Sequence, residues 1–166
     1  LGEKTYFNDS FGYVNLDYFS EAKEYLVNVK VVDKSNASDE INFTFEYQEM
    51  IGLIVDSNSF SINGSQGEEI NILGDLDLES ENNPTIMNAG NVELDLGVIG
   101  EGISDVPLES SSLIIGNLSS VINDDLNVVN LGLNKGSLES FDLRFKLRED
   151  AIKSDSSFKI SLIGVA

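Results

Sequence analysis

The side chains best suited to chemistry in this sequence are carboxylates. The densest acidic run carries four of them at every second position, namely Asp75, Asp77, Glu79 and Glu81, and Asn123-Asp124-Asp125 is a second cluster. Calcium takes about six to eight oxygen ligands, usually from a loop that wraps the ion. The first run therefore predicts a weak calcium site. The competing interpretation is a solvated acidic strand face that discourages edge-to-edge pairing.

Asparagine supplies the second kind of candidate site. Five asparagines stand in the N-x-[ST] pattern that accepts glycans, namely Asn8, Asn36, Asn42, Asn63 and Asn117. Three of them fall on expected turns or loops, and Asn42 falls on the polar side of an expected strand. We expect these positions to be glycosylated if the protein is secreted. Coincidence in an asparagine-rich chain is the alternative.

The composition excludes several classes of function. The 166 residues include no His, Cys or Trp, which removes Ser-His-Asp triads, thiol nucleophiles, zinc fingers and iron–sulfur ligation. With 29 acidic and 10 basic residues the net charge is −19, so phosphate backbones and anionic lipid are repelled. Carboxylate pairs are unavoidable by chance, and no acid–base pair can be singled out. We expect no enzyme, no cofactor apart from calcium, no nucleic acid partner and no membrane insertion.

The aromatic residues mark a break in composition near residue 50. All five Tyr and five of the nine Phe lie in the first 47 residues. We therefore expect two domains, 1–49 and 50–166. Fewer than about 50 residues rarely hold a core without disulfides or metal, so the first domain is expected to be incomplete on its own. Because the chain begins with Leu1, we expect a processed product or a fragment. A whole subunit completed by a neighbour's strand is the alternative.

Alternation of apolar and polar residues predicts the elements that position these side chains. The expected strands lie within 25–32, 41–47, 70–79, 92–98, 141–148 and 158–162. The first two are expected to form an antiparallel hairpin across the segment DKSNASDE. No helix longer than a single turn is expected, at 20–25 or 148–153. Strands of this spacing, separated by turn signals, predict an all-β fold and are typical of a sandwich.

Two stretches resemble known repeats of surface proteins. Residues 6–47 resemble the second half of a cadherin-like, immunoglobulin-type (Ig-like) repeat, on Phe7-Asn8 with Gly12, Tyr25–Val29 and Asp33. Residues 51–166 resemble a repeat common on archaeal and bacterial surfaces. That likeness rests on a middle hairpin of the N-x-G-N type at 88–91 and on the late strand motif G-x-x-x-x-F-x-L-R at 136–144.

The resemblance implies Ig-like antiparallel β-sandwich modules in tandem, on the extracellular surface of an archaeal or bacterial cell. It implies a structural or adhesive role, as in a stalk, sheath or filament. The expected partners are neighbouring copies or other surface proteins, and strand complementation between copies would build a homopolymer. The alternative is a carbohydrate-binding or calcium-binding extracellular module.

Overall fold

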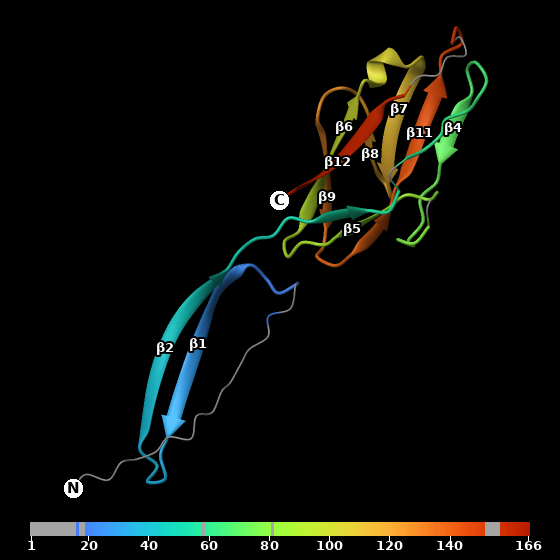
Figure 1. Ribbon diagram of the computed structural model, residues 1–166. Coiled ribbons are helices and arrows are strands. Elements are labelled where there is room, and N and C mark those ends of the chain that lie inside the picture. Colours follow the sequence, from blue (N-terminus) through green and yellow to red (C-terminus); the bar gives the residue numbers. More distant parts are fainter. Residues whose placement is uncertain (1–15, 17–18, 58, 81, 152–156) are drawn as a thin grey trace.

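The computed structural model describes residue 16 and residues 19–57, 59–80, 82–151 and 157–166 (Figure 1). This part of the chain holds strands and one 3-10 turn, η1 (Ile103–Asp105), but no α-helix, so the predicted all-β class is confirmed. The strands are β1 (Lys23–Val32), β2 (Ser38–Tyr47), β3 (Leu53–Val55), β4 (Glu69–Ile72), β5 (Thr85–Asn88), β6 (Leu94–Glu101), β7 (Leu108–Ile115), β8 (Leu118–Val121), β9 (Asn127–Leu133), β10 (Leu138–Ser140), β11 (Asp142–Leu147) and β12 (Lys159–Val165).

The strands form four antiparallel sheets. Strands β1 and β2 pair with each other, β10-β5-β3 form a second sheet, β4-β11-β7-β8 a third and β12-β6-β9 a fourth. In Figure 1 the β1–β2 hairpin extends away from the body formed by the other strands. The hairpin predicted over DKSNASDE is confirmed. Its turn includes Asn36 at φ 64°, a left-handed conformation that Asn tolerates better than most residues.

The body encloses one hydrophobic core. Alternate residues of β7 and β11 face alternate residues of β6 and β9, because successive side chains of a strand point to opposite sides of its sheet. The buried side chains from these strands are Leu96, Val98, Leu113, Ile115, Val129, Leu133, Leu143 and Phe145. The alternation predicted for 92–98 and 141–148 is therefore confirmed, with Leu94, Leu96 and Val98 at most 1% exposed.

The strand predicted over 70–79 is only partly correct. Strand β4 ends at Ile72, and residues 75–80 form an irregular loop with a turn. At Gly74 the chain passes so close to its neighbours that a Cβ would lie 2.4 Å from the Phe141 carbonyl oxygen and 2.5 Å from that of Pro84. A side-chain hydrogen bond stabilises the loop that follows, in which Asp75 Oδ1 accepts from the Asp77 amide at 2.8 Å.

The segment Asn88–Asn91 makes a turn, but the hairpin predicted for it is wrong. Strand β5 ends at Asn88 and belongs to the β10-β5-β3 sheet, whereas β6 belongs to the β12-β6-β9 sheet. The chain therefore crosses between two sheets here. Nor is 20–25 a helical turn, since β1 begins at Lys23. Part of the other helical candidate, residues 152–153, lies outside the described residues.

Candidate interaction surface

The β1–β2 hairpin sorts its side chains into an apolar face and a polar face. Residues paired across an antiparallel ladder lie on the same side, so the register defines five rows on one face. These rows are Lys23–Tyr47, Tyr25–Phe45, Val27–Phe43, Val29–Ile41 and Val31–Asp39. We call this side the apolar face, because eight of its ten residues are aliphatic or aromatic. Its two charged members, Lys23 and Asp39, stand at opposite ends.

Within the part of the chain that the structure describes, the apolar face is not covered as such a pattern normally is. Its exposed fractions are 41% at Val29, 51% at Val31, 63% at Ile41, 51% at Phe43 and 37% at Phe45. Large contiguous apolar patches on a protein surface usually mark an interaction site. Strands β1 and β2 also pair only with each other among the described strands, so each has one open edge there.

Aromatic contacts order the base of the hairpin. The rings of Tyr25 and Phe45 stack with centroids 5.5 Å apart and planes 12° apart. The Tyr25 hydroxyl donates to the Glu21 carbonyl oxygen at 2.9 Å, and Lys23 Nζ lies 5.3 Å from the Tyr25 ring centroid. A hydrogen bond from Lys23 holds the pKa of Glu21 below its ordinary value. These contacts hold the Tyr25 ring in one orientation at the end of the hairpin that carries the Lys23–Tyr47 row.

The opposite side of the hairpin is largely polar. Asn28 Nδ2 donates to Asn42 Oδ1 at 2.8 Å and also contacts the Glu40 carboxylate. The sequon residue Asn42 therefore lies on the polar face, as its strand position predicted. A glycan at Asn42 would project away from the apolar face.

The connector between hairpin and body is fixed by one buried side chain. Asn91 is 3% exposed; its Nδ2 donates to the Gln48 carbonyl at 2.9 Å and its Oδ1 accepts from the Met50 amide at 2.6 Å. The Asn91 backbone amide donates to the Met50 carbonyl at 3.0 Å. Residues 48–50, on both sides of the predicted boundary, are therefore anchored to the 88–91 turn.

We expect Asn91→Ala to release this connector. The change removes two hydrogen bonds and leaves the Gln48 carbonyl and the Met50 amide without their partner, a loss of about 1–3 kcal/mol in the free energy of unfolding. Proteolysis between residues 47 and 52 should become faster, which timed digestion with peptide mapping would measure. An unchanged cleavage rate there would contradict the role given to Asn91.

The predicted glycosylation positions are accessible wherever the structure describes them. Asn36 lies in the β1–β2 turn, Asn63 in an irregular segment and Asn117 in the two-residue turn between β7 and β8, and all three are exposed. Asn42 is exposed as well. Asn8 lies outside the described residues. These placements are compatible with glycan attachment, which stays a prediction.

The acidic run is a hydrogen-bonded loop rather than a row on a strand. Thr85 Oγ1 donates to the Asp75 carbonyl at 2.8 Å, and Ser80 Oγ lies 3.1 Å from Asp75 Oδ1. Asp77 Oδ1 accepts from the Glu79 amide at 3.0 Å, and Glu81 lies outside the described residues. Within the described ranges no three or more acidic side chains gather as a metal-binding group. Calcium binding by this loop stays a prediction.

Asp75 should make the stability of the loop depend on pH. The amide of Asp77, with the Ser80 and Thr85 hydroxyls, holds the pKa of Asp75 below its usual 3.8. A lowered folded-state pKa means that the stabilisation is complete above about pH 4 and is lost as the pH falls through the folded-state value. We expect the difference in unfolding free energy between wild type and Asp75→Asn to shrink on acidification below about pH 4. A difference independent of pH would contradict this.

The second acidic cluster also serves local structure. Asp124 Oδ1 accepts from the Gly102 amide at 3.0 Å, and a hydrogen bond from the Ser104 side chain is the main reason that the pKa of Asp124 is lowered. Asn123 Oδ1 accepts from Asn127 Nδ2 at 2.7 Å. The bonds to Asp124 tie the segment before β9 to the segment around η1, whereas the Asn123–Asn127 bond is local.

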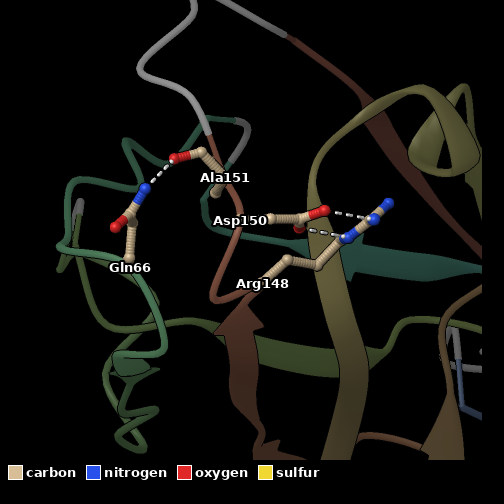
Figure 2. Close-up of polar contacts among 4 residues, drawn as sticks. All are labelled: Gln66, Arg148, Asp150 and Ala151. Carbon is tan, nitrogen blue, oxygen red and sulfur yellow. Dashed lines mark hydrogen bonds and ion pairs between the residues drawn. The ribbon is translucent and has the colours of Figure 1, made fainter.

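Charged side chains at the end of β11 are largely paired among themselves. Figure 2 shows Arg148 making two bonds to Asp150, at 2.9 and 2.8 Å, and Gln66 donating to the Ala151 carbonyl at 2.8 Å. Beside them Lys146 Nζ lies 2.7 Å from Glu109. Exposed pairs of this kind contribute about 0–1 kcal/mol each to stability.

Two turns that are far apart in the sequence contact each other, which the sequence pattern did not predict. The Gly136 amide donates to the Asn88 carbonyl at 2.8 Å, and the Asn88 amide donates to the Ser137 carbonyl at 3.1 Å. The 88–91 and 134–136 turns therefore form one junction next to the connector. The asparagines in both turns were the available signal, but only the fold brings them together.

No family model, curated protein or solved structure matches this chain. Among the described residues no helix is long and apolar enough to cross a membrane.

Proposed function

We propose that this chain is a non-enzymatic structural or adhesive module of an extracellular surface protein. It would consist of tandem Ig-like β-sandwich modules, 1–49 and 50–166, the first incomplete on its own. The observation that carries the proposal is the exposed apolar face of the β1–β2 hairpin, attached to a body that already encloses its own core. A chain built in this way has one surface that another polypeptide would stabilise.

The antiparallel ladders suit such a role. Backbone bonds of the β4-β11-β7-β8 and β12-β6-β9 sheets run between strands that share one core, so the body would withstand force as a unit. Among the described strands β1 and β2 each have one open edge, whose amides and carbonyls an added strand can pair with, which is the mechanism of strand complementation. Stalks, sheaths and filaments are assemblies that use these properties.

The net charge of −19 would limit contacts elsewhere on the surface. Like charge keeps neighbouring molecules from associating without specificity. The four described sequon asparagines are exposed and none lies on the apolar face. Glycans at these positions would therefore leave that face open for a specific contact.

The proposal is tested on the protein made by its native cells. Mild protease treatment of intact cells should cleave it, and peptide mapping should find added mass at the sequon asparagines. A protein that stays protected until the cells are lysed, and that carries only its polypeptide mass, would contradict an extracellular role.

Four aromatic side chains on the apolar face favour a second candidate function, carbohydrate binding. Tyr25, Phe43, Phe45 and Tyr47 line one side of a sheet, and flat aromatic surfaces can stack on sugar rings. A carbohydrate-binding module should bind a soluble glycan saturably, and Phe43→Ala should abolish that binding. Calorimetric titration with a panel of oligosaccharides measures this; no binding by the wild-type chain would exclude the second candidate.

A further inference from the structure

We infer that the apolar face of the β1–β2 hairpin is a contact surface between two copies of this chain, packed face to face with their hairpins antiparallel. The inference rests on the proposed function, for which it names the partner. It is carried by the area of the face, the charges at its two ends and the distance between the two bodies.

The area is sufficient for a specific, weak contact. The eight aliphatic and aromatic side chains leave on the order of 500–600 Å² uncovered in each chain, so two copies would bury roughly 1,000–1,200 Å². That total is at the lower limit of specific protein–protein interfaces. A continuous face can also be matched by its own copy, since a twofold axis brings the same patch of both chains together.

The charges at the ends select the antiparallel arrangement. The apolar face has Lys23 in its first row, next to the body, and Asp39 in its last row, next to the turn. A twofold axis along the middle row, Val27–Phe43, would bring Lys23 of each copy to the end row that holds Asp39 of the other, one strand away. A parallel arrangement would instead gather both Lys23 side chains in one end row and both Asp39 side chains in the other, which is unfavourable.

The same arrangement keeps the acidic bodies apart. Each strand of the hairpin has ten residues and is about 33 Å long, so the two bodies would lie at opposite ends of the shared hairpin layer (Figure 1). That separation is several times the Debye length of about 8 Å at physiological salt. Repulsion between the two acidic bodies would therefore be largely screened.

Sedimentation velocity of the full 166-residue chain over a range of concentrations tests this inference. We expect a reversible monomer–dimer equilibrium that Phe43→Lys, at the twofold axis, weakens at least about 100-fold by burying a charge. Thr44→Lys adds the same charge at the neighbouring position on the polar face, and should leave the equilibrium unchanged. A wild-type monomer at all concentrations, or equal effects of the two substitutions, would overturn the inference.

Charge exchange tests the direction of packing without touching the apolar residues. Lys23→Glu alone and Asp39→Lys alone should each weaken the dimer, and the double variant should restore it. If both single variants dimerise weakly and the double variant does not regain dimerisation, the antiparallel arrangement is wrong. A monomer that is nevertheless glycosylated and exposed on cells would overturn this inference but not the proposed function, whereas an intracellular protein would overturn the proposed function itself.

Discussion

Phe145→Ala is expected to lower the free energy of unfolding of the body by about 3–5 kcal/mol, the cost of replacing a large buried aromatic side chain. Phe145 is 1% exposed on β11, and its ring meets that of Phe158 edge to face with centroids 5.6 Å apart. The substitution removes this contact and leaves a cavity between the β4-β11-β7-β8 and β12-β6-β9 sheets. That loss is a large fraction of the roughly 5–15 kcal/mol by which a domain is stable.

Denaturant unfolding followed by far-ultraviolet circular dichroism measures this loss. Arg144→Ala is the matched control, because Arg144 precedes Phe145 on the same strand and its side chain is 51% exposed. Its ion pair with Glu69 is a surface pair, worth about 0–1 kcal/mol. Equal losses in the two variants would contradict the position of the core.

Asn88→Ala is expected to have the second largest effect, a loss of at least about 3 kcal/mol. The Asn88 side chain is fully buried; its Nδ2 donates to the Val92 carbonyl at 2.7 Å and the Leu133 carbonyl at 2.8 Å, and its Oδ1 accepts from the Gly90 amide at 2.8 Å. Alanine removes all three bonds in a place that water does not reach. The crossing from β5 to β6 would then lose the contacts that fix its path.

The same unfolding experiment tests Asn88, with Asn130→Ala as control. Asn130 is an exposed residue of β9 in the described chain, and its replacement should change the unfolding free energy by less than about 0.5 kcal/mol. A mild effect of Asn88→Ala, similar to that of Asn130→Ala, would show that the junction does not depend on this side chain.

Tyrosine fluorescence is a second probe of unfolding, and it reports on a different part of the chain from circular dichroism. All five Tyr lie in the first 47 residues, so their fluorescence follows the hairpin end of the chain, while circular dichroism is dominated by the longer body. If 1–49 and 50–166 are separate domains, Phe145→Ala should shift the dichroism transition and leave the fluorescence transition in place. A shared shift of both transitions would contradict the two-domain division.

Local pattern was enough to predict the long strands. In β6 and β11 every second residue is apolar over at least five positions, because one side of each strand faces the core, as Leu96 and Leu143 show. The hairpin was predictable for the same reason, with polar turn residues between two alternating runs. Gly116-Asn117, between β7 and β8, is a two-residue turn signal of a kind that could have identified those two strands as well.

Other features depend on contacts that are distant in sequence. Leu76 and Leu78 alternate with acids like a strand, but the chain leaves the sheet at Gly74, where the carbonyls of Phe141 and Pro84 crowd it. The strands β3 and β10 have three residues each, too few to show a period. Whether the apolar face of the hairpin is covered also cannot be read from its own sequence, because the pattern of a covered face and of an exposed one is the same.

Photo-cross-linking from the centre of the apolar face tests the contact between two copies most directly. A photoreactive phenylalanine analogue would replace Phe43, and isotopically heavy and light chains would be mixed before irradiation. We expect cross-linked products of one heavy and one light chain that join position 43 to the Val27–Phe43 row of the other copy. No such products should form with the analogue at Thr44. Products confined to single copies, or equal yields from both positions, would contradict this contact.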